Sequence, residues 1–141
     1  MKIYLSTKEN ENKEYTQVTN IVSLENMALD SEVTSMVVDC FLCGFSLKNL
    51  DQVIDKILKK MRLNSDLTII DKDIDILCLK HNRDEISLDE LNSLFFSGNH
   101  PQSFLTLETV EKSLQNKISI VEKLINNTDG SFIIKGRRLK W

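Results

Sequence analysis

Two short apolar stretches decide the fold of this chain: Val33-Thr34-Ser35-Met36-Val37-Val38-Asp39 and Asp66-Leu67-Thr68-Ile69-Ile70-Asp71. In both, apolar residues fall at odd and at even positions, which is typical of strands that are covered on both faces. Between them, apolar residues recur at three- and four-residue steps with charged residues in the gaps, which predicts an amphipathic helix over 50–61 that begins after an Asn49 N-cap. A strand, a helix and a strand in this order predict a parallel pair joined by a crossover helix.

The rest of the chain supplies further strands and helices around this unit. Strands are expected at Lys2–Leu5 and 15–22, with an irregular connection over 23–31 and a turn over 61–65. A short helix is indicated by Ile74, Leu77, Cys78 and His81, and a capping-box pattern at Ser87 begins another that ends near Phe96. A helix over 106–114 and a hairpin of strands 117–125 and 131–139 complete the prediction.

Composition places the chain among ordinary globular proteins. With 141 residues, 41% hydrophobic and 28% charged, it fits one domain, 1–141, that can bury a core of its own. The net charge of −3 gives no overall attraction for nucleic acid, and no apolar run is long enough to span a bilayer. Three cysteines without a signal-peptide core at the N-terminus predict reduced thiols and a cytoplasmic protein.

Several segments resemble the small class I S-adenosylmethionine (SAM) methyltransferases. Val33–Asp39 stands where their fourth strand lies, and Leu42-Cys43-Gly44-Phe45 falls on their Leu-Glu-His-Phe position. Met61-Arg62-Leu63-Asn64-Ser65 falls on their Leu-Lys-Pro-Gly-Gly turn, which leads into a fifth strand at 67–71. The resemblance implies a three-layer, Rossmann-like α/β fold of reduced size, with a mostly parallel sheet and a C-terminal antiparallel hairpin.

The positions that hold the cofactor in that family differ in this chain. Ser6-Thr7-Lys8-Glu9 stands where a Gly-x-Gly turn follows the first strand, and Asn20 stands where an acid binds the ribose. Glycines at such a turn let the backbone approach a cofactor closely, and side chains crowd that space. Cys43 and Gly44 replace the Glu and His of the Leu-Glu-His motif.

Two functions are therefore expected from the resemblance. The first is a SAM-dependent methyltransferase acting on a small or sugar-like molecule, with SAM over the strand ends near Leu5, Ser6, Thr7, Asn20, Ile21 and Asp39. The second is a pseudoenzyme, a binding or assembly module that kept the fold and lost the cofactor. Because a truncated sheet leaves an edge that a second copy can cover, a homodimer is an expected partner arrangement.

The remaining motifs each carry two interpretations. One motif has the paired spacing of a zinc site or a redox pair: Cys40, Cys43, Cys78 and His81. The alternative, which is favoured here, is that the thiols are buried in apolar surroundings and bind nothing. Asp71, Asp73 and Asp75 follow a strand, where they face a ligand or cap a helix. Asp71 and the loop residue His100 are the candidate catalytic groups. The basic end from Lys135 to Trp141 has two interpretations. It is a surface that binds phosphate or a partner, or it is a solvated edge strand, and the edge strand is favoured.

Overall fold

The computed structural model describes residues 1–96 and 101–139. The first half of the chain contains β1 (Lys2–Leu5), β2 (Thr16–Val18), α1 (Ile21–Met27), β3 (Val33–Asp39), α2 (Leu50–Lys60) and β4 (Met61–Lys72), with short 3₁₀ turns at Leu42–Gly44 and Leu47–Asn49. The second half contains α3 (Ile74–Asn82), α4 (Leu88–Phe96), α5 (Leu107–Leu114), β5 (Ile118–Asn126) and β6 (Ser131–Arg138). Within the described ranges, no helix has the length and apolar character needed to cross a membrane.

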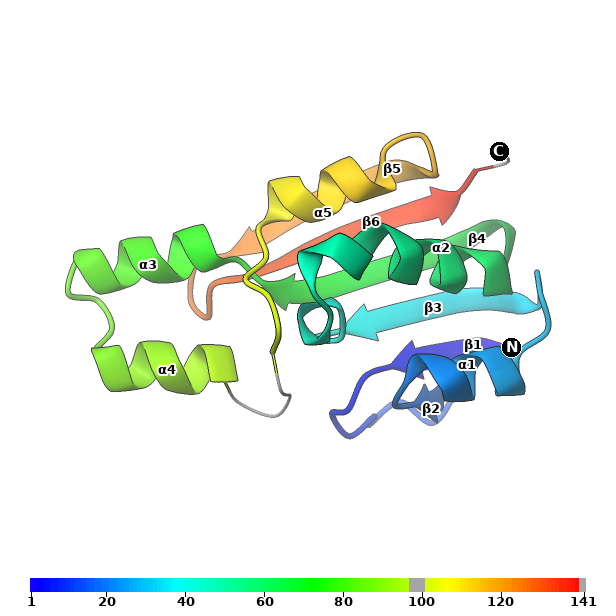
Figure 1. Ribbon diagram of the computed structural model, residues 1–141, viewed down its shortest axis with the longest axis horizontal. Coiled ribbons are helices and arrows are strands. Elements are labelled where there is room, and N and C mark those ends of the chain that lie inside the picture. Colours follow the sequence, from blue (N-terminus) through cyan, green and yellow to red (C-terminus); the bar gives the residue numbers. More distant parts are fainter. Residues whose placement is uncertain (97–100, 140–141) are drawn as a thin grey trace.

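The strands form one mixed sheet in the order β2-β1-β3-β4-β6-β5 (Figure 1). β1 pairs in parallel with β2 and β3, and β3 pairs in parallel with β4, with Val37 opposite Thr68. β6 runs antiparallel to both β4 and β5. The predicted parallel pair with its crossover helix is therefore confirmed, as are the mostly parallel sheet and its C-terminal hairpin.

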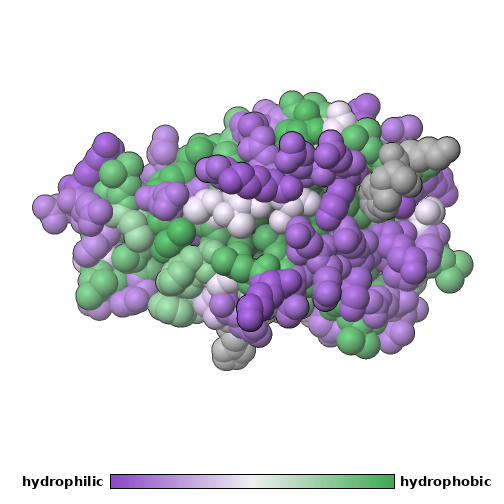
Figure 2. Space-filling model, turned by 45° about the horizontal axis from the view of Figure 1, so that its top comes forward, coloured by the Kyte–Doolittle hydropathy of each residue, from purple (hydrophilic) through white to green (hydrophobic). Residues whose placement is uncertain are grey.

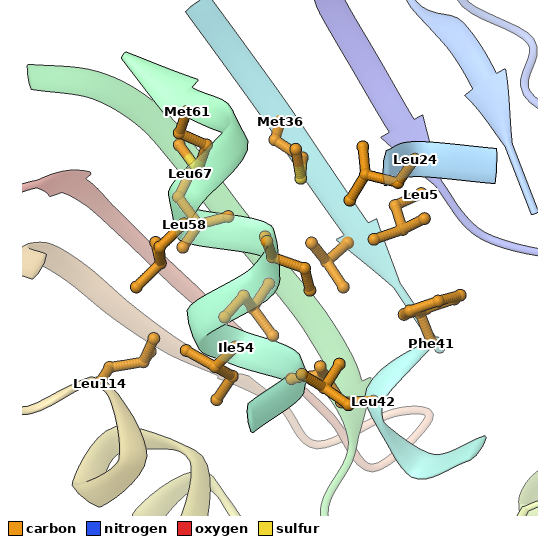
Figure 3. Packing of buried hydrophobic residues seen from close by; sticks show 14 of the residues in the cluster. Leu5, Leu24, Met36, Phe41, Leu42, Ile54, Leu58, Met61, Leu67 and Leu114 are labelled. Carbon is orange, nitrogen blue, oxygen red and sulfur yellow. The ribbon is translucent and has the colours of Figure 1, made fainter. Parts of the chain in front are cut away.

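One face of the sheet carries the hydrophobic core. Helices α1, α2 and α5 lie over this face, whereas α3 and α4 lie beyond the carboxyl ends of the strands (Figure 1). Figure 3 shows Ile54 and Leu58 of α2 packed against side chains of the sheet. The strand residues below the helices are almost fully buried: Ile3, Leu5, Met36, Val38, Leu67, Ile69, Phe132 and Ile134. Burial of such side chains contributes about 1.5–3 kcal/mol each, so this layer is the main source of stability.

The opposite face of the sheet has a different character. Tyr4, Val37, Thr68, Ile70 and Ile133 alternate with the core residues along their strands, and each is only half-buried. Alternation places successive side chains on opposite faces. Tyr4 and Asp39, which also belong to this face, meet at its carboxyl edge, where the candidate site is built.

The segment between β2 and β3 differs from the prediction. The strand expected over 15–22 ends at Val18, and the irregular connection expected over 23–31 is helical as far as Met27. The side-chain Oδ1 of Asn20 accepts a hydrogen bond from the Ser23 N–H at 2.8 Å and begins α1. Burial of Ile21 and Leu24 against the core then outweighs the strand propensity of the β-branched residues.

Around α2, one prediction is confirmed in part and one is wrong. The helix begins at Leu50 directly after Asn49, as expected, but the Asn49 side chain makes no capping hydrogen bond and its backbone angles are already helical. The turn expected over 61–65 is the irregular start of β4: the register with β3 shifts there, and Asn64 has a left-handed φ of 61°. The pairing becomes regular at Asp66, where the expected strand begins.

The C-terminal half follows the prediction more closely. The hydroxyl groups of Ser87 and Thr106 cap α4 and α5 by accepting from Glu90 N–H and Thr109 N–H, both at 3.1 Å. The interpretation of the basic end as an edge strand is wrong, because β6 lies between β4 and β5. Lys140 and Trp141 lie outside the described residues.

A substitution at Gly136 tests whether β6 lies inside the sheet, next to β5. A Cβ at Gly136 would lie 2.7 Å from the carbonyl oxygen of Ser119 on β5, so the two backbones would have to separate. We expect Gly136→Ala to lower the free energy of unfolding by about 1–3 kcal/mol in urea titrations. Gly44→Ala is the matched control, since its Cβ would meet nothing within 4 Å. Equal stabilities of the two variants would contradict the described β5–β6 contact.

Candidate functional site

The candidate site lies where the parallel strands end. Because β1, β3 and β4 point the same way, the residues that follow them meet at one edge of the sheet. In open α/β sheets this carboxyl edge is where ligands bind. A small cavity of about 80 Å³ lies there, lined by Lys8, Cys40, Cys43, Asp71, Lys72, Leu94 and Phe95.

Asp71 forms the buried polar wall of this cavity. Its residue surface is only 1% exposed, and its carboxylate accepts hydrogen bonds from the Lys72 N–H at 2.9 Å and the Cys43 N–H at 3.3 Å. Burial raises the pKa of the Asp71 carboxyl to about 6, although these hydrogen bonds act in the opposite direction. A carboxyl group with this pKa can accept or release a proton near neutral pH.

Asp39, at the end of β3, is the second carboxylate of the site. The Tyr4 hydroxyl donates a hydrogen bond to its Oδ2 across the β1–β3 pair. Its Oδ1 is buried and accepts no hydrogen bond from the described residues; the ammonium of Lys8 lies 3.7 Å away. Burial, together with the bond to Asp39, raises the pKa of Tyr4, so the phenol stays protonated and serves as a donor.

Lys8 reaches the site from the loop that follows β1. The Ser6 hydroxyl accepts the Lys8 N–H at 3.0 Å, and the Ser6 N–H donates to the Val18 carbonyl at 3.0 Å. The Gln17 side-chain amide donates to the Ser6 carbonyl. The loop backbone is thus anchored to β2, while the Lys8 side chain remains 47% exposed. Ion pairs of this exposure contribute only ~0–1 kcal/mol.

A second, shallower hollow of about 400 Å³ lies on the other side of Lys8. Its lining is polar and comes from the β1–β2 loop and β2: Thr7, Lys8, Glu9, Asn10, Asn12, Lys13, Tyr15, Gln17 and Thr19. The side-chain Oε1 of Gln17 is buried in this region and has no hydrogen-bond partner among the described residues. Lys8 is the residue that lines both hollows.

Helix α4 closes the cavity on its apolar side. Leu94 and Phe95 line the cavity, and the Phe95 ring lies 4.3 Å from that of Phe104, centroid to centroid. Figure 2 shows hydrophobic side chains among the hydrophilic ones at the end of the molecule that α3 and α4 build, where Leu88 and Phe96 are largely exposed. The site therefore combines two carboxylates and an ammonium with an aromatic wall.

Within the described residues, Cys40, Cys43, Cys78 and His81 do not come together as the zinc site that the sequence analysis weighed and disfavoured. Burial, followed by the nearby Asp71 carboxylate, raises the pKa of Cys40 to about 11 and also raises that of Cys43, which keeps both thiols protonated. Metal binding and thiol exchange need the thiolate. Cys78 is exposed on α3, and no three potential metal-ligating side chains gather within residues 1–96 and 101–139. The favoured interpretation as buried apolar thiols is also wrong, because Cys40 and Cys43 are only half-buried and line the cavity beside Asp71 and Lys8.

The predicted cofactor residues are only partly brought together. Ser6 and Asp39 lie beside Lys8, and Thr7 lines the shallow hollow. Leu5 and Ile21 are buried in the core, and Asn20 caps α1. The candidate base His100 lies outside the described residues.

The three acidic residues after β4 have separate roles. Asp73 is buried and caps α3 by accepting from the Asp75 N–H at 2.9 Å, while its other oxygen accepts from Leu107 N–H at 2.9 Å. Asp75 is exposed in the first turn of α3. The helix-capping interpretation therefore holds for Asp73, whereas Asp71 faces the cavity. Sequence analysis missed Tyr4, Lys8 and Phe95. Tyr4 and Lys8 contact Asp39 over more than thirty positions, and contacts of this kind leave no local pattern.

The volumes set a limit on what the described site accepts. Pockets for drug-sized ligands measure roughly 300–1,000 Å³, several times the cavity beside Asp71. The side chains of Ser6 and Lys8 also occupy the space next to the end of β1. In this arrangement the cavity does not fit a molecule as large as SAM.

Comparison with known proteins identifies the fold. No family model and no curated protein matches the sequence. Among solved structures, the PH0226 protein of Pyrococcus horikoshii OT3 is 12% identical, with a TM-score of 0.65 over 98% of this chain and 72% of that one. The N-methyltransferase NodS of Bradyrhizobium japonicum WM9, in complex with S-adenosylhomocysteine (SAH), is 14% identical, with a TM-score of 0.56 over 89% of this chain.

Magnesium protoporphyrin IX methyltransferase of Synechocystis PCC 6803, with bound SAH, is 13% identical, with a TM-score of 0.55 over 89% of this chain. This chain spans about half the length of the two methyltransferases, 55% of NodS and 51% of the Synechocystis enzyme. At these identities the likeness establishes the fold alone. The chain has a class I methyltransferase-like fold.

The raised pKa of Asp71 predicts how stability depends on pH. The carboxyl binds its proton more tightly in the folded chain than at its ordinary pKa of 3.8, so its ionisation destabilises the fold as pH rises. Relative to Asp71→Asn, the unfolding free energy of the wild type should fall by about 2.5 kcal/mol between pH 4 and pH 8. Urea titrations over this range measure it. Asp66→Asn, at an exposed carboxylate, is the control. If the difference in unfolding free energy between the wild type and Asp71→Asn does not change with pH, burial does not raise this pKa.

Proposed function

We propose that this chain is a SAM-dependent methyltransferase-like protein that acts on a small molecule at the carboxyl ends of β1, β3 and β4. The single observation that carries the proposal is the meeting of Asp39, Asp71 and Lys8 at the edge where this fold binds ligands. Perturbed ionisable groups cluster at functional sites, and Asp71 is such a group. Neighbours with this fold, NodS and the Synechocystis enzyme, hold SAH in their structures.

In this proposal Asp71 is the general base that accepts the proton of the acceptor molecule. A hydroxyl or amine that receives a methyl group must give up its proton, and Asp71 stands buried at the cavity wall to accept it. Its pKa of about 6 leaves it mostly ionised at pH 7 and still basic enough to hold a proton. Leu94 and Phe95 provide an apolar surface for the body of a small acceptor. When bound, SAM would supply an activated methyl group; the described cavity has to enlarge before it can enter.

Cofactor binding is tested by titrating SAM and SAH in calorimetry and thermal unfolding. A ligand present at a hundred times its dissociation constant stabilises a fold by about 2.7 kcal/mol, which raises the melting temperature of a chain of this size by several degrees. We expect SAH to have this effect and adenosine alone to have a smaller one. Asp39→Asn should weaken SAH binding, whereas Asp66→Asn, at an exposed site, should not. No shift with millimolar SAM or SAH would sink the proposal.

The second candidate function is an inactive module that assembles through its sheet. The observation that favours it is edge strand β5, in which Val121, Leu124 and Ile125 are all exposed, Val121 by 69%. An exposed apolar edge strand presents unpaired backbone groups to another strand. A second copy of the chain, paired β5 to β5, would cover both edges with one two-fold interface.

Assembly is tested by measuring molar mass by light scattering across a hundred-fold range of concentration. The second candidate predicts a dimer that Leu124→Lys disrupts, because a lysine on edge strand β5 opposes its pairing with the β5 strand of a second copy. Leu63→Lys, which changes an exposed leucine of β4, is the control and should leave the mass unchanged. A monomer at every concentration would remove this candidate and leave the first untouched.

A further inference from the structure

Lys8 stands between the two hollows of the site. It is common to the lining of the 80 Å³ cavity beside Asp71 and of the 400 Å³ hollow beside Gln17. Its ammonium is held by Asp39 at 3.7 Å, which keeps the side chain across the boundary. Moving this one side chain would therefore connect the hollows into a continuous groove of the size that small-molecule ligands occupy.

Two buried acceptor atoms point to what the connected groove would bind. Oδ1 of Asp39 and Oε1 of Gln17 are both buried and without a hydrogen bond from the described residues. Buried acceptors of this kind are rare in folded proteins, and each leaves a desolvated group that a donor would satisfy. Tyr4 lies between their strands, opposite Gln17 in the β1–β2 pair, so both acceptors belong to one neighbourhood.

We propose that Lys8 is a displaceable plug whose ammonium occupies the subsite for a positively charged N–H group of the ligand. On binding, an ammonium of the ligand takes the place of the Lys8 Nζ at Asp39, and an N–H or O–H donor elsewhere on the ligand reaches Gln17. The ligand class is a cationic, polar small molecule with an apolar part that faces Leu94 and Phe95. This inference rests on the proposed function, because the amino-acid portion of SAM or SAH carries such an ammonium.

The packing of Lys8 suits this role. The loop backbone is fixed by the Ser6 bonds to Lys8 N–H and to Val18, so the displacement involves the side chain alone. The side chain is already half exposed, and its displacement gives up the long ion pair with Asp39 and an interaction with Cys40. The pKa of its ammonium is raised, since the interactions with Cys40 and Asp39 outweigh the opposing effect of burial, and the plug stays charged at neutral pH.

The main experiment compares SAH binding by the wild type, Lys8→Met and Lys13→Met in calorimetry. Methionine keeps an apolar stem of similar length and removes the charge that binds Asp39. A plug that leaves the site open about a fifth of the time lowers the apparent affinity about five-fold, so Lys8→Met should bind SAH about five-fold more tightly. Lys13 lines the same shallow hollow, and Lys13→Met should bind like the wild type. Adding Asp39→Asn to Lys8→Met should abolish the gain.

A second measurement tests the plug without SAH. Methylammonium chloride at 100 mM, compared with potassium chloride, should raise the melting temperature of Lys8→Met and leave those of the wild type and of Lys8→Met/Asp39→Asn unchanged. If the wild type and Lys8→Met bind SAH equally, or if methylammonium does not stabilise Lys8→Met, the plug is overturned while the proposed function stands. If methylammonium stabilises Lys8→Met but SAH binds to no variant, the plug stands and SAM binding fails.

Discussion

The parallel pairing of β3 with β4 is the constraint on which the rest of the structure depends. With Met36 and Val38 on one strand and Leu67 and Ile69 on the other, the pair presents a continuous apolar surface that α2 covers. A parallel connection requires the chain to return along the whole strand, so α2 must cross the core face. The same geometry brings the ends of the two strands to one edge, and the site exists because Asp39 and Asp71 follow those ends.

At this edge carboxylates are buried away from water, and burial destabilises their charged forms. Asp71 is almost fully buried with two backbone donors and, among the residues that the structure describes, no cation in hydrogen-bonding contact, so its ionised form is poorly compensated. Asp39 keeps one oxygen that accepts no hydrogen bond from this part of the chain. By contrast, Asp73 meets donors with both oxygens and joins α3 to α5. Uncompensated polar groups that persist in a stable fold are concentrated at functional sites, whereas Asp73 has the satisfied environment of a structural residue.

The sequence predicted the elements whose signal is local. The strand pair, the crossover helix, the cap at Ser87 and the hairpin each follow from periodicity or from a short motif. The helix α1 was missed because it has only seven residues and buries only two of them, so tertiary packing decides it against strand propensity. The site was less predictable. Lys8 meets Asp39 from thirty-one positions away, and Asp71 differs from Asp73 only by what surrounds it in space.

The side chains in the loop after β1 determine the chemistry of the whole edge. A glycine turn would leave open space above the strand end, since glycine has no side chain to occupy it. Here the Ser6 hydroxyl and carbonyl bind the Lys8 N–H and the Gln17 amide, so the loop closes on itself and on β2. In this loop the Lys8 ammonium lies 3.7 Å from Asp39, and the Lys8 side chain lines both hollows. With side chains in place of glycines, this loop does more than fill space, because it supplies a cation of the chain's own to the Asp39 carboxylate.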